Sequence, residues 1–140
     1  MLINIKDRLD EPAIQELLAC SVFPDPDRVM ETIETYRREP ERELYGHESE
    51  GEIIGLIGFR LENGGTLTID HLAVRPDCRG AGFGRGLLLE TLELKEPREM
   101  VAETDEDAVD FYRSTGFIVV SLGENYPGAE RFRCIYRAEE

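Results

Sequence analysis

The chain has no tryptophan and only three cysteines, Cys20, Cys78 and Cys134, among its 140 residues. These cysteines are odd in number, far apart and without a CxxC spacing, which argues against a disulfide framework and against a zinc site. We therefore expect a reducing, cytoplasmic location and no bound metal. The longest mostly apolar run, Ile53–Phe59, is far shorter than the ~20 residues of a membrane span, so we expect neither a targeting nor a transmembrane segment.

Basic residues are scarce, with 16 Lys and Arg against 30 Asp and Glu and a net charge of −14. This excess disfavours non-specific binding to nucleic acid or to an anionic membrane, because both carry charge of the same sign. The hydrophobic fraction of 41% excludes a disordered chain. A chain of this length can bury roughly two thirds of its unfolded surface, so a single domain over residues 1–140 needs no disulfide or metal.

The pattern of apolar residues, breakers and caps predicts a mixed α/β chain of α+β class with the order βααβββαβαββ. An antiparallel front half leads into a βαβ crossover, which implies a mixed sheet with helices on both faces. The chain is expected to begin with a strand at 2–5 and a helix that Asp10 caps, with Ile14, Leu17 and Leu18 on its apolar face. A loop at 24–27 leads to a helix carrying Val29, Met30, Ile33 and Tyr36, and extended chain follows over 43–74 with turns at 49–51 and 63–65.

The second half is expected to contain a helix carrying Leu87, Leu88, Leu92 and Leu94, a strand at 100–104 and a helix from the 104–107 cap to Gly116. It ends with strands at 117–122 and 131–136 around a turn at Pro127–Gly128.

A glycine-dense segment at 79–86, RGAGFGRG, follows the predicted strand 66–74 and opens the next helix. Glycines there let the backbone approach an anion, and the unpaired N–H groups of the first helical turn point toward it. Three arginines and one aspartate between Arg75 and Arg85 make this stretch locally basic. A phosphate site is the favoured interpretation, and the alternative is a tight turn without a ligand, whose arginines are solvated.

Two common phosphate motifs do not fit this segment. A P-loop needs GxxxxGK[ST], and the lysine and hydroxyl residue are missing. A dinucleotide fingerprint needs GxGxxG, and Arg85 stands where the third glycine belongs. Glu103 could imitate the ribose-binding carboxylate, but the preceding strands are antiparallel hairpins. A nucleotide-binding α/β protein therefore remains only a third hypothesis.

The stretch 72–88, LAVRPDCRGAGFGRGLL, resembles the acyl-CoA-binding motif of the GNAT acyltransferase superfamily, whose [QR]xxGx[GA] core is matched by Arg79, Gly82 and Gly84. The stretch 108–117, AVDFYRSTGF, resembles the family's Axx[FY]YxxxGF element. The resemblance implies a GNAT-like fold, with a mostly antiparallel sheet of about seven strands whose fourth and fifth strands splay apart. It also implies acetyl-CoA as co-substrate.

The resemblance further implies where acetyl-CoA binds. The backbone of strand residues 72–74 would pair with the pantetheine arm, and the amides of 79–84 would hold the pyrophosphate. Many members carry asparagine seven residues before the motif tyrosine, where this chain has Asp105, whose carboxylate accepts but does not donate; capping the following helix is an equal alternative. The implied cofactor-binding residues are Leu72, Ala73, Val74, Arg79, Gly80, Ala81, Gly82, Phe83, Gly84, Asp105 and Tyr112.

For catalysis, the resemblance assigns Tyr112 as the acid for the departing thiolate. Asp70 and Glu103, and with less support His71, are candidates for the base that takes the amine proton, although each could be structural. By family analogy the acceptor site includes the segments 20–27 and 123–130, and the acidic surface favours a cationic amine.

The predicted function is N-acetyl transfer from acetyl-CoA to a primary amine of a small molecule or peptide, by direct attack in a ternary complex. The alternative is a non-catalytic acyl-CoA-binding or regulatory module. The sequence leaves monomer and homodimer open.

Overall fold

The computed structural model describes residues 2–21, 25–124, 127 and 129–138. Its element order confirms the predicted βααβββαβαββ pattern, with two added 3-10 turns. The strands form one seven-stranded, mostly antiparallel sheet in the order β1-β2-β3-β4-β5-β7-β6. The elements are β1 (Leu2–Asn4), η1 (Lys6–Arg8), α1 (Pro12–Ser21), α2 (Pro26–Arg38), β2 (Arg42–Ser49), β3 (Glu52–Glu62), β4 (Thr66–Val74), η2 (Pro76–Cys78), α3 (Phe83–Lys95), β5 (Glu99–Asp105), α4 (Val109–Ser114), β6 (Ile118–Glu124) and β7 (Glu130–Arg137).

Two compact units make up the chain. Unit 1 comprises Met1–Arg60 and Asp70–Lys95, and unit 2 comprises Leu61–Ile69 and Glu96–Glu140. The boundary within β4, between Ile69 and Asp70, coincides with the end of its parallel pairing with β5, whose last pair is Ile69–Ala102. Beyond this pair β5 continues to Asp105 against β7. The predicted splay of the fourth and fifth strands is therefore confirmed.

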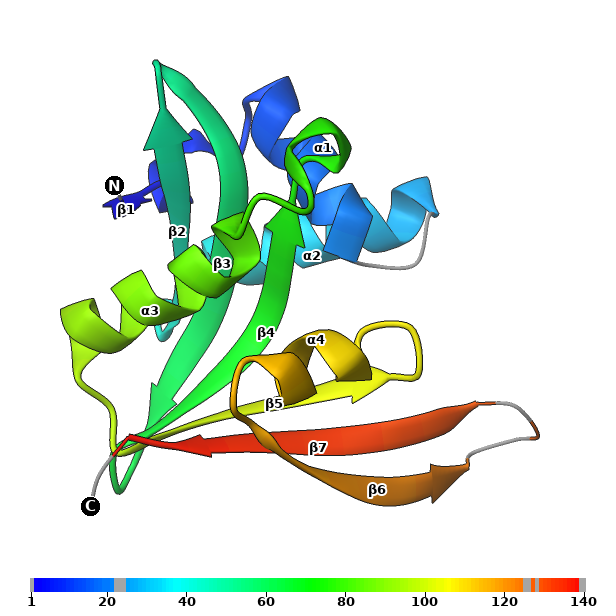
Figure 1. The fold of residues 1–140 in the computed structure, drawn as a ribbon. Coiled ribbons are helices and arrows are strands. Elements are labelled where there is room, and N and C mark those ends of the chain that lie inside the picture. The colour runs from blue at the N-terminus through cyan, green and yellow to red at the C-terminus, as the bar shows by residue number, and fades with distance from the viewer. Residues whose placement is uncertain (1, 22–24, 125–126, 128, 139–140) are drawn as a thin grey trace. The chain divides into compact units, whose positions relative to one another are not determined.

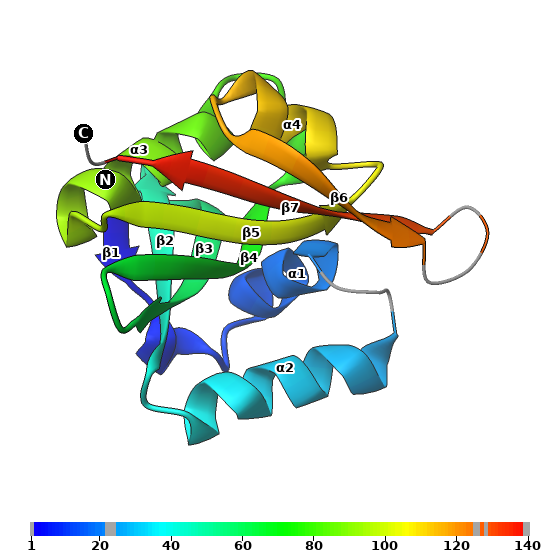
Figure 2. The same cartoon turned by 90° about the horizontal axis from the view of Figure 1, so that it is seen from below.

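In unit 1, α1 and α2 cover one face of the strands and α3 covers the other (Figures 1 and 2). Two glycines of β3 allow this close packing. A Cβ added at Gly58 would overlap the ring of Tyr36 from α2, and one at Gly55 would lie 3.0 Å from Leu87 of α3. One cluster of buried side chains lies on the α1–α2 side and consists of Ile5, Leu9, Ile14, Leu17, Leu18, Ile33, Tyr36, Leu44, Ile53, Leu56 and Ala73.

In unit 2, α4 packs with aromatic side chains near the strands. Phe117 makes edge-to-face contact with Tyr112 at 5.2 Å between ring centroids and also contacts Tyr136. The helix ends in a Schellman motif, in which the Phe117 N–H donates to the Tyr112 carbonyl and the Gly116 N–H to the Arg113 carbonyl. Gly116 has φ of 97°, as its predicted position after the helix requires.

One boundary in the sequence interpretation is wrong. Pro26 lies inside α2 and not in a loop, because Asp25 caps the helix by accepting from the Asp27 N–H and proline suits the first helical position. Met30 and Leu94 lie in helices as predicted, and their side chains are 54% and 49% exposed. Residues 22–24 and 128, which belong to two predicted loops, lie outside the described residues.

Candidate acyl-CoA and catalytic site

The segment 79–85 of unit 1 forms an open turn, which we call the anion turn. Gly80 and Gly82 have φ of 84° and 85°, in the left-handed region that favours glycine, and nothing lies within 4 Å of a Cβ added at either. Within the described chain, no backbone N–H from Arg79 to Arg85 donates to a protein acceptor, and the first bond of the following helix runs from Gly86 N to Gly82 O. These free donors at the positive end of α3 suit a phosphate.

The arginines around the anion turn differ in their availability. Arg75 donates to Glu52 at 2.6 Å and to Asp77 at 2.8 Å, so two carboxylates already neutralise it. Arg79 is exposed, and its Nε donates to the Val74 carbonyl at 3.2 Å. The carbonyl of Val74 belongs to the strand segment predicted to pair with pantetheine. Arg79 and Arg85, which form no ion pair with the described residues, therefore supply the positive charge here.

Tyr112 lies in unit 2 with its ring buried and its hydroxyl accessible. The residue is only 7% exposed, packed between the rings of Phe111 and Phe117. Its hydroxyl has no hydrogen-bond partner among the described residues. Every fully enclosed side-chain oxygen or nitrogen in the described chain does have such a partner, so the Tyr112 hydroxyl is not fully enclosed and reaches the surface. Burial, followed by the nearby Cys134, raises the pKa of Tyr112 far above its ordinary value. The hydroxyl therefore stays protonated at any physiological pH and can donate a hydrogen bond.

The two carboxylates among the predicted base candidates have different surroundings. In unit 1, Asp70 is 12% exposed at its side chain, and both its carboxylate oxygens accept from arginines, Arg42 and Arg60. In unit 2, Glu103 follows the last β4–β5 pair, is 48% exposed at its side chain and pairs with Arg133 at 3.0 Å. Glu103 is therefore the more accessible carboxylate.

Asp105 caps the turn before α4. Its Oδ1 accepts from the Asp107 N–H at 3.0 Å and from the Ala108 N–H at 3.3 Å. One carboxylate oxygen is thus occupied by the capping role that the sequence offered as an alternative to cofactor contact. Leu72, Ala73 and Val74 form the end of β4 as expected.

Sequence reasoning overlooked a contact between Tyr36 of α2 and His71 of β4. The Tyr36 hydroxyl lies 2.6 Å from His71 Nδ1, and the two residues are 35 positions apart. Gly58 within the apolar run of β3 was the available signal, because an isolated glycine in a strand often marks a close approach.

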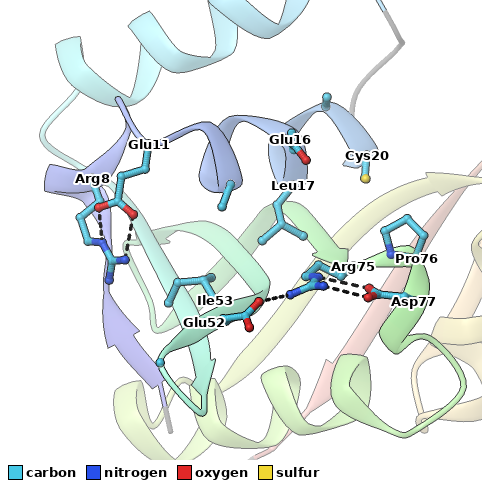
Figure 3. A pocket seen from close by; sticks show the side chains of 13 residues that line it. Arg8, Glu11, Glu16, Leu17, Cys20, Glu52, Ile53, Arg75, Pro76 and Asp77 are labelled. Atoms are coloured by element: carbon cyan, nitrogen blue, oxygen red, sulfur yellow. Dashed lines mark hydrogen bonds and ion pairs between the residues drawn. The ribbon is translucent and has the colours of Figure 1, made fainter.

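A hollow of about 790 Å³ lies in unit 1 between α1 and the ends of β3 and β4. Figure 3 shows its two ion-paired groups, Arg8 with Glu11, and Arg75 with Glu52 and Asp77. Glu16 adds a further carboxylate and Leu17 an apolar wall. With two guanidinium groups against four carboxylates, the hollow favours a cation over a phosphate. Cys20, part of the predicted acceptor region, lines it; residues 22–24, 125–126 and 128 of that region lie outside the described chain.

Comparison with known proteins decides the family. The model of the acetyltransferase (GNAT) family matches residues 11–117. The chain belongs to the GNAT family. An uncharacterized N-acetyltransferase encoded in the lysA 3′ region of Bacillus methanolicus is 28% identical over 72% of this chain and 84% of its own length. The peptidyl-lysine N-acetyltransferase YjaB of Escherichia coli (strain K12) is 38% identical over 51% of this chain and 52% of its own.

The solved structures agree in fold. An aminoglycoside 6′-N-acetyltransferase complexed with coenzyme A superposes with a TM-score of 0.76 at 17% identity, over 98% of this chain and 96% of the other. No helix of the described residues is long and apolar enough to cross a membrane, and they contain no cluster of three or more potential metal ligands. The protein is thus a GNAT acetyltransferase-family enzyme, with N-acetyltransferases among its relatives.

Proposed function

We propose that this GNAT protein transfers an acetyl group from acetyl-CoA to a primary amine of a small molecule or peptide, by direct attack in a ternary complex. The observation that carries the proposal is the anion turn, whose N–H groups from Arg79 to Arg85 have no protein acceptor in the described chain. Glycines inside a first helical turn cost about 1 kcal/mol each relative to alanine, and phosphate binding would offset this cost.

The residues present fit acetyl-CoA. Backbone amides of 79–84, with Arg79 and Arg85 beside them, would hold the pyrophosphate, and the backbone of Leu72–Val74 would pair with the pantetheine arm. Arg79 would first release the Val74 carbonyl. Bound acetyl-CoA supplies an activated acyl group. Asp105 and Tyr112 complete the proposed set of contacts, Asp105 through its free carboxylate oxygen.

The transfer forms a bond between the amine nitrogen and the acyl carbon and breaks the bond from that carbon to sulfur. The amine loses one proton and the departing thiolate gains one. We propose that the Tyr112 hydroxyl, which burial keeps protonated, donates the proton that the thiolate gains. Donation from a phenol to a thiolate is uphill by about 2 kcal/mol at ordinary pKa values, and the raised pKa of Tyr112 makes it more so. A hydrogen bond from the hydroxyl to the sulfur is therefore the larger part of this role.

As the acceptor of the amine proton we propose Glu103, directly or through water, because its carboxylate is half exposed. Asp70, the other candidate, is held by two arginines, and this favours a structural contribution. As the substrate that receives the acetyl group we propose a cationic amine. The acid-rich hollow beside α1 and the net charge of −14 support this choice.

We also propose that residues 1–140 act as one transferase domain in the cytoplasm. The family match over 11–117 runs through both units, and the three cysteines are free. Monomeric and homodimeric forms both suit this proposal.

The deciding experiment combines binding with chemistry. Acetyl-CoA at about 100 times its Kd should stabilise the fold by about 2.7 kcal/mol, seen as a rise in melting temperature, and NAD or ATP should not. Free thiol should then appear when amines, aminoglycosides or lysine peptides are added. Stabilisation without transfer to any amine would favour the non-catalytic acyl-CoA-binding module, and no stabilisation would remove both functions.

A further inference from the structure

The contact between Tyr36 and His71 lies at a place where the fold leaves no freedom. Tyr36 is completely buried, and its hydroxyl lies directly over the Cα of Gly58, where any side chain would overlap it. Its only hydrogen-bond partner among the described residues is His71 Nδ1 at 2.6 Å. The two rings are tilted by 53° with centroids 5.5 Å apart. The orientation of the imidazole is therefore fixed by α2 and β3.

The direction of this hydrogen bond follows from the chemistry of the pair. Burial raises the pKa of Tyr36 well above its ordinary value, so the hydroxyl keeps its proton. That proton has no other acceptor, and a buried donor without an acceptor is costly, so Tyr36 donates and Nδ1 accepts. Burial also lowers the pKa of His71, against the opposing effect of Asp70 and with that of Arg42. The neutral ring therefore carries its proton on Nε2.

His71 Nε2 is free to meet a ligand. It has no hydrogen-bond partner in the described part of the chain. Every fully enclosed side-chain nitrogen there does have a partner, so Nε2 is not fully enclosed and reaches the surface. The charged groups around the ring are Asp70 on β4, Arg42 on β2 and Arg60 on β3, and the two arginines are engaged with Asp70. A neutral N–H donor is thus presented without a competing acceptor.

The position of His71 along β4 indicates what this donor would meet. His71 comes two residues after the last β4–β5 pair, Ile69–Ala102, and directly before Leu72–Val74. A ligand held by its phosphates at the anion turn and extended backward along Leu72–Val74 has its sulfur end nearest to His71. This step rests on the proposed function.

We propose that His71 donates its Nε2–H to the carbonyl oxygen of the acyl group, and that Tyr36 is the positioning residue that holds His71 for this contact. Negative charge develops on this oxygen as the amine attacks, and an oriented donor stabilises it. His71 in this role is not the base that takes the amine proton.

Three variants test the proposal through thiol-release kinetics. His71→Ala should lower kcat by about 100-fold with the acetyl-CoA affinity retained. His71→Gln, whose side-chain amide offers an N–H near the same place, should keep most of the activity, since a donor and not a base is needed. Tyr36→Phe should lower kcat by about tenfold, because the ring loses its anchor. Tyr45→Phe is the matched control and should change little, because its ring lies on the α3 face of the sheet, 5.4 Å from Lys95 Nζ.

Nitrogen NMR of labelled protein supplies a readout independent of turnover. We expect His71 to show a protonated Nε2 and an accepting Nδ1 in the wild type, and the Nδ1 hydrogen-bond signature to vanish in Tyr36→Phe. Protonation at Nδ1 in the wild type would overturn the proposal, as would His71→Gln being as inactive as His71→Ala while both bind acetyl-CoA. A wild type that transfers to no amine would instead refute the proposed function, and the His71 role with it.

Discussion

Arg60 donates hydrogen bonds to both carboxylate oxygens of Asp70, from Nε to Oδ2 at 3.0 Å and from Nη2 to Oδ1 at 2.9 Å. Arg42 adds a third bond, from Nη1 to Oδ2 at 3.0 Å. The three residues come from β2, β3 and β4, so this ion cluster links the strands of unit 1 beside His71.

Replacing Asp70 with asparagine should therefore destabilise the fold. The change removes the carboxylate that Arg42 and Arg60 share, and breaking a largely buried ion pair costs about 3 kcal/mol. Arg42 keeps its second ion pair, with Glu39 at 2.7 Å. Urea denaturation followed by circular dichroism measures the loss. Asp110→Asn, whose partner Arg113 and own side chain are exposed, is the matched control and should have little effect. An Asp70→Asn protein with wild-type stability and no transfer would make Asp70 the base instead.

The sequence predicts local features of this fold well and distant contacts poorly. The end of α4 is set by Gly116 and the turns by Gly51 and Gly64–Gly65, because a positive φ strongly favours glycine. By contrast, Asp70 meets Arg42 across 28 residues, and no spacing rule connects them. The same limit hid the contact of Tyr36 with His71, which depends on how α2 packs on the sheet.

The candidate site divides in the same way. The anion turn could be identified from 79–86 alone, because its function resides in backbone donors and glycines that adjoin in sequence. The carboxylate that serves as base could not be identified from the sequence, because Asp70 and Glu103 have the same chemistry and differ only in their exposure and their partners.

Gly82→Ala tests the anion turn. An alanine at φ of 85° is strained by about 1 kcal/mol although the surrounding space is open, and the shifted amides should weaken acetyl-CoA binding about tenfold. Gly51→Ala is a close control, since Gly51 has φ of 82° and equally open surroundings but lies in the β2–β3 turn. Calorimetric titration should show equal binding for Gly51→Ala and wild type. Equal affinity in all three proteins would contradict phosphate binding at the turn.

Tyr112→Phe tests the proposed acid. The ring remains packed against Phe117, so the melting temperature and the acetyl-CoA affinity should change little. The rate of thiol release should fall by about 100-fold, within the range attributed to positioned proton donors. Tyr136→Phe is the control, because it removes a hydroxyl from another ring packed on Phe117. A Tyr112→Phe enzyme with unchanged kcat would leave Tyr112 as a core residue only.

Glu103→Gln tests the proposed base. Its ion pair with Arg133 is half exposed, so the stability should be nearly unchanged, while kcat/KM should fall by about 100-fold or more. The control is Glu99→Gln on the same strand, where Glu99 accepts from Thr66 at 3.0 Å. Equal rates for both variants would exclude Glu103 as the base.

Alkaline pH should reveal the two buried tyrosines. The pKa values of Tyr36 and Tyr112 are raised in the native state mainly by burial, whereas both groups ionise near 10 when unfolded. Below about pH 10 both states keep these protons and the stabilising contribution is complete; above it only the unfolded state loses them, so stability falls by up to about 1.4 kcal/mol per pH unit for each tyrosine. Urea denaturation between about pH 9 and pH 11 measures the slope. Tyr36→Phe and Tyr112→Phe should each make it shallower, and an unchanged slope in both would show that these hydroxyls ionise in the folded protein.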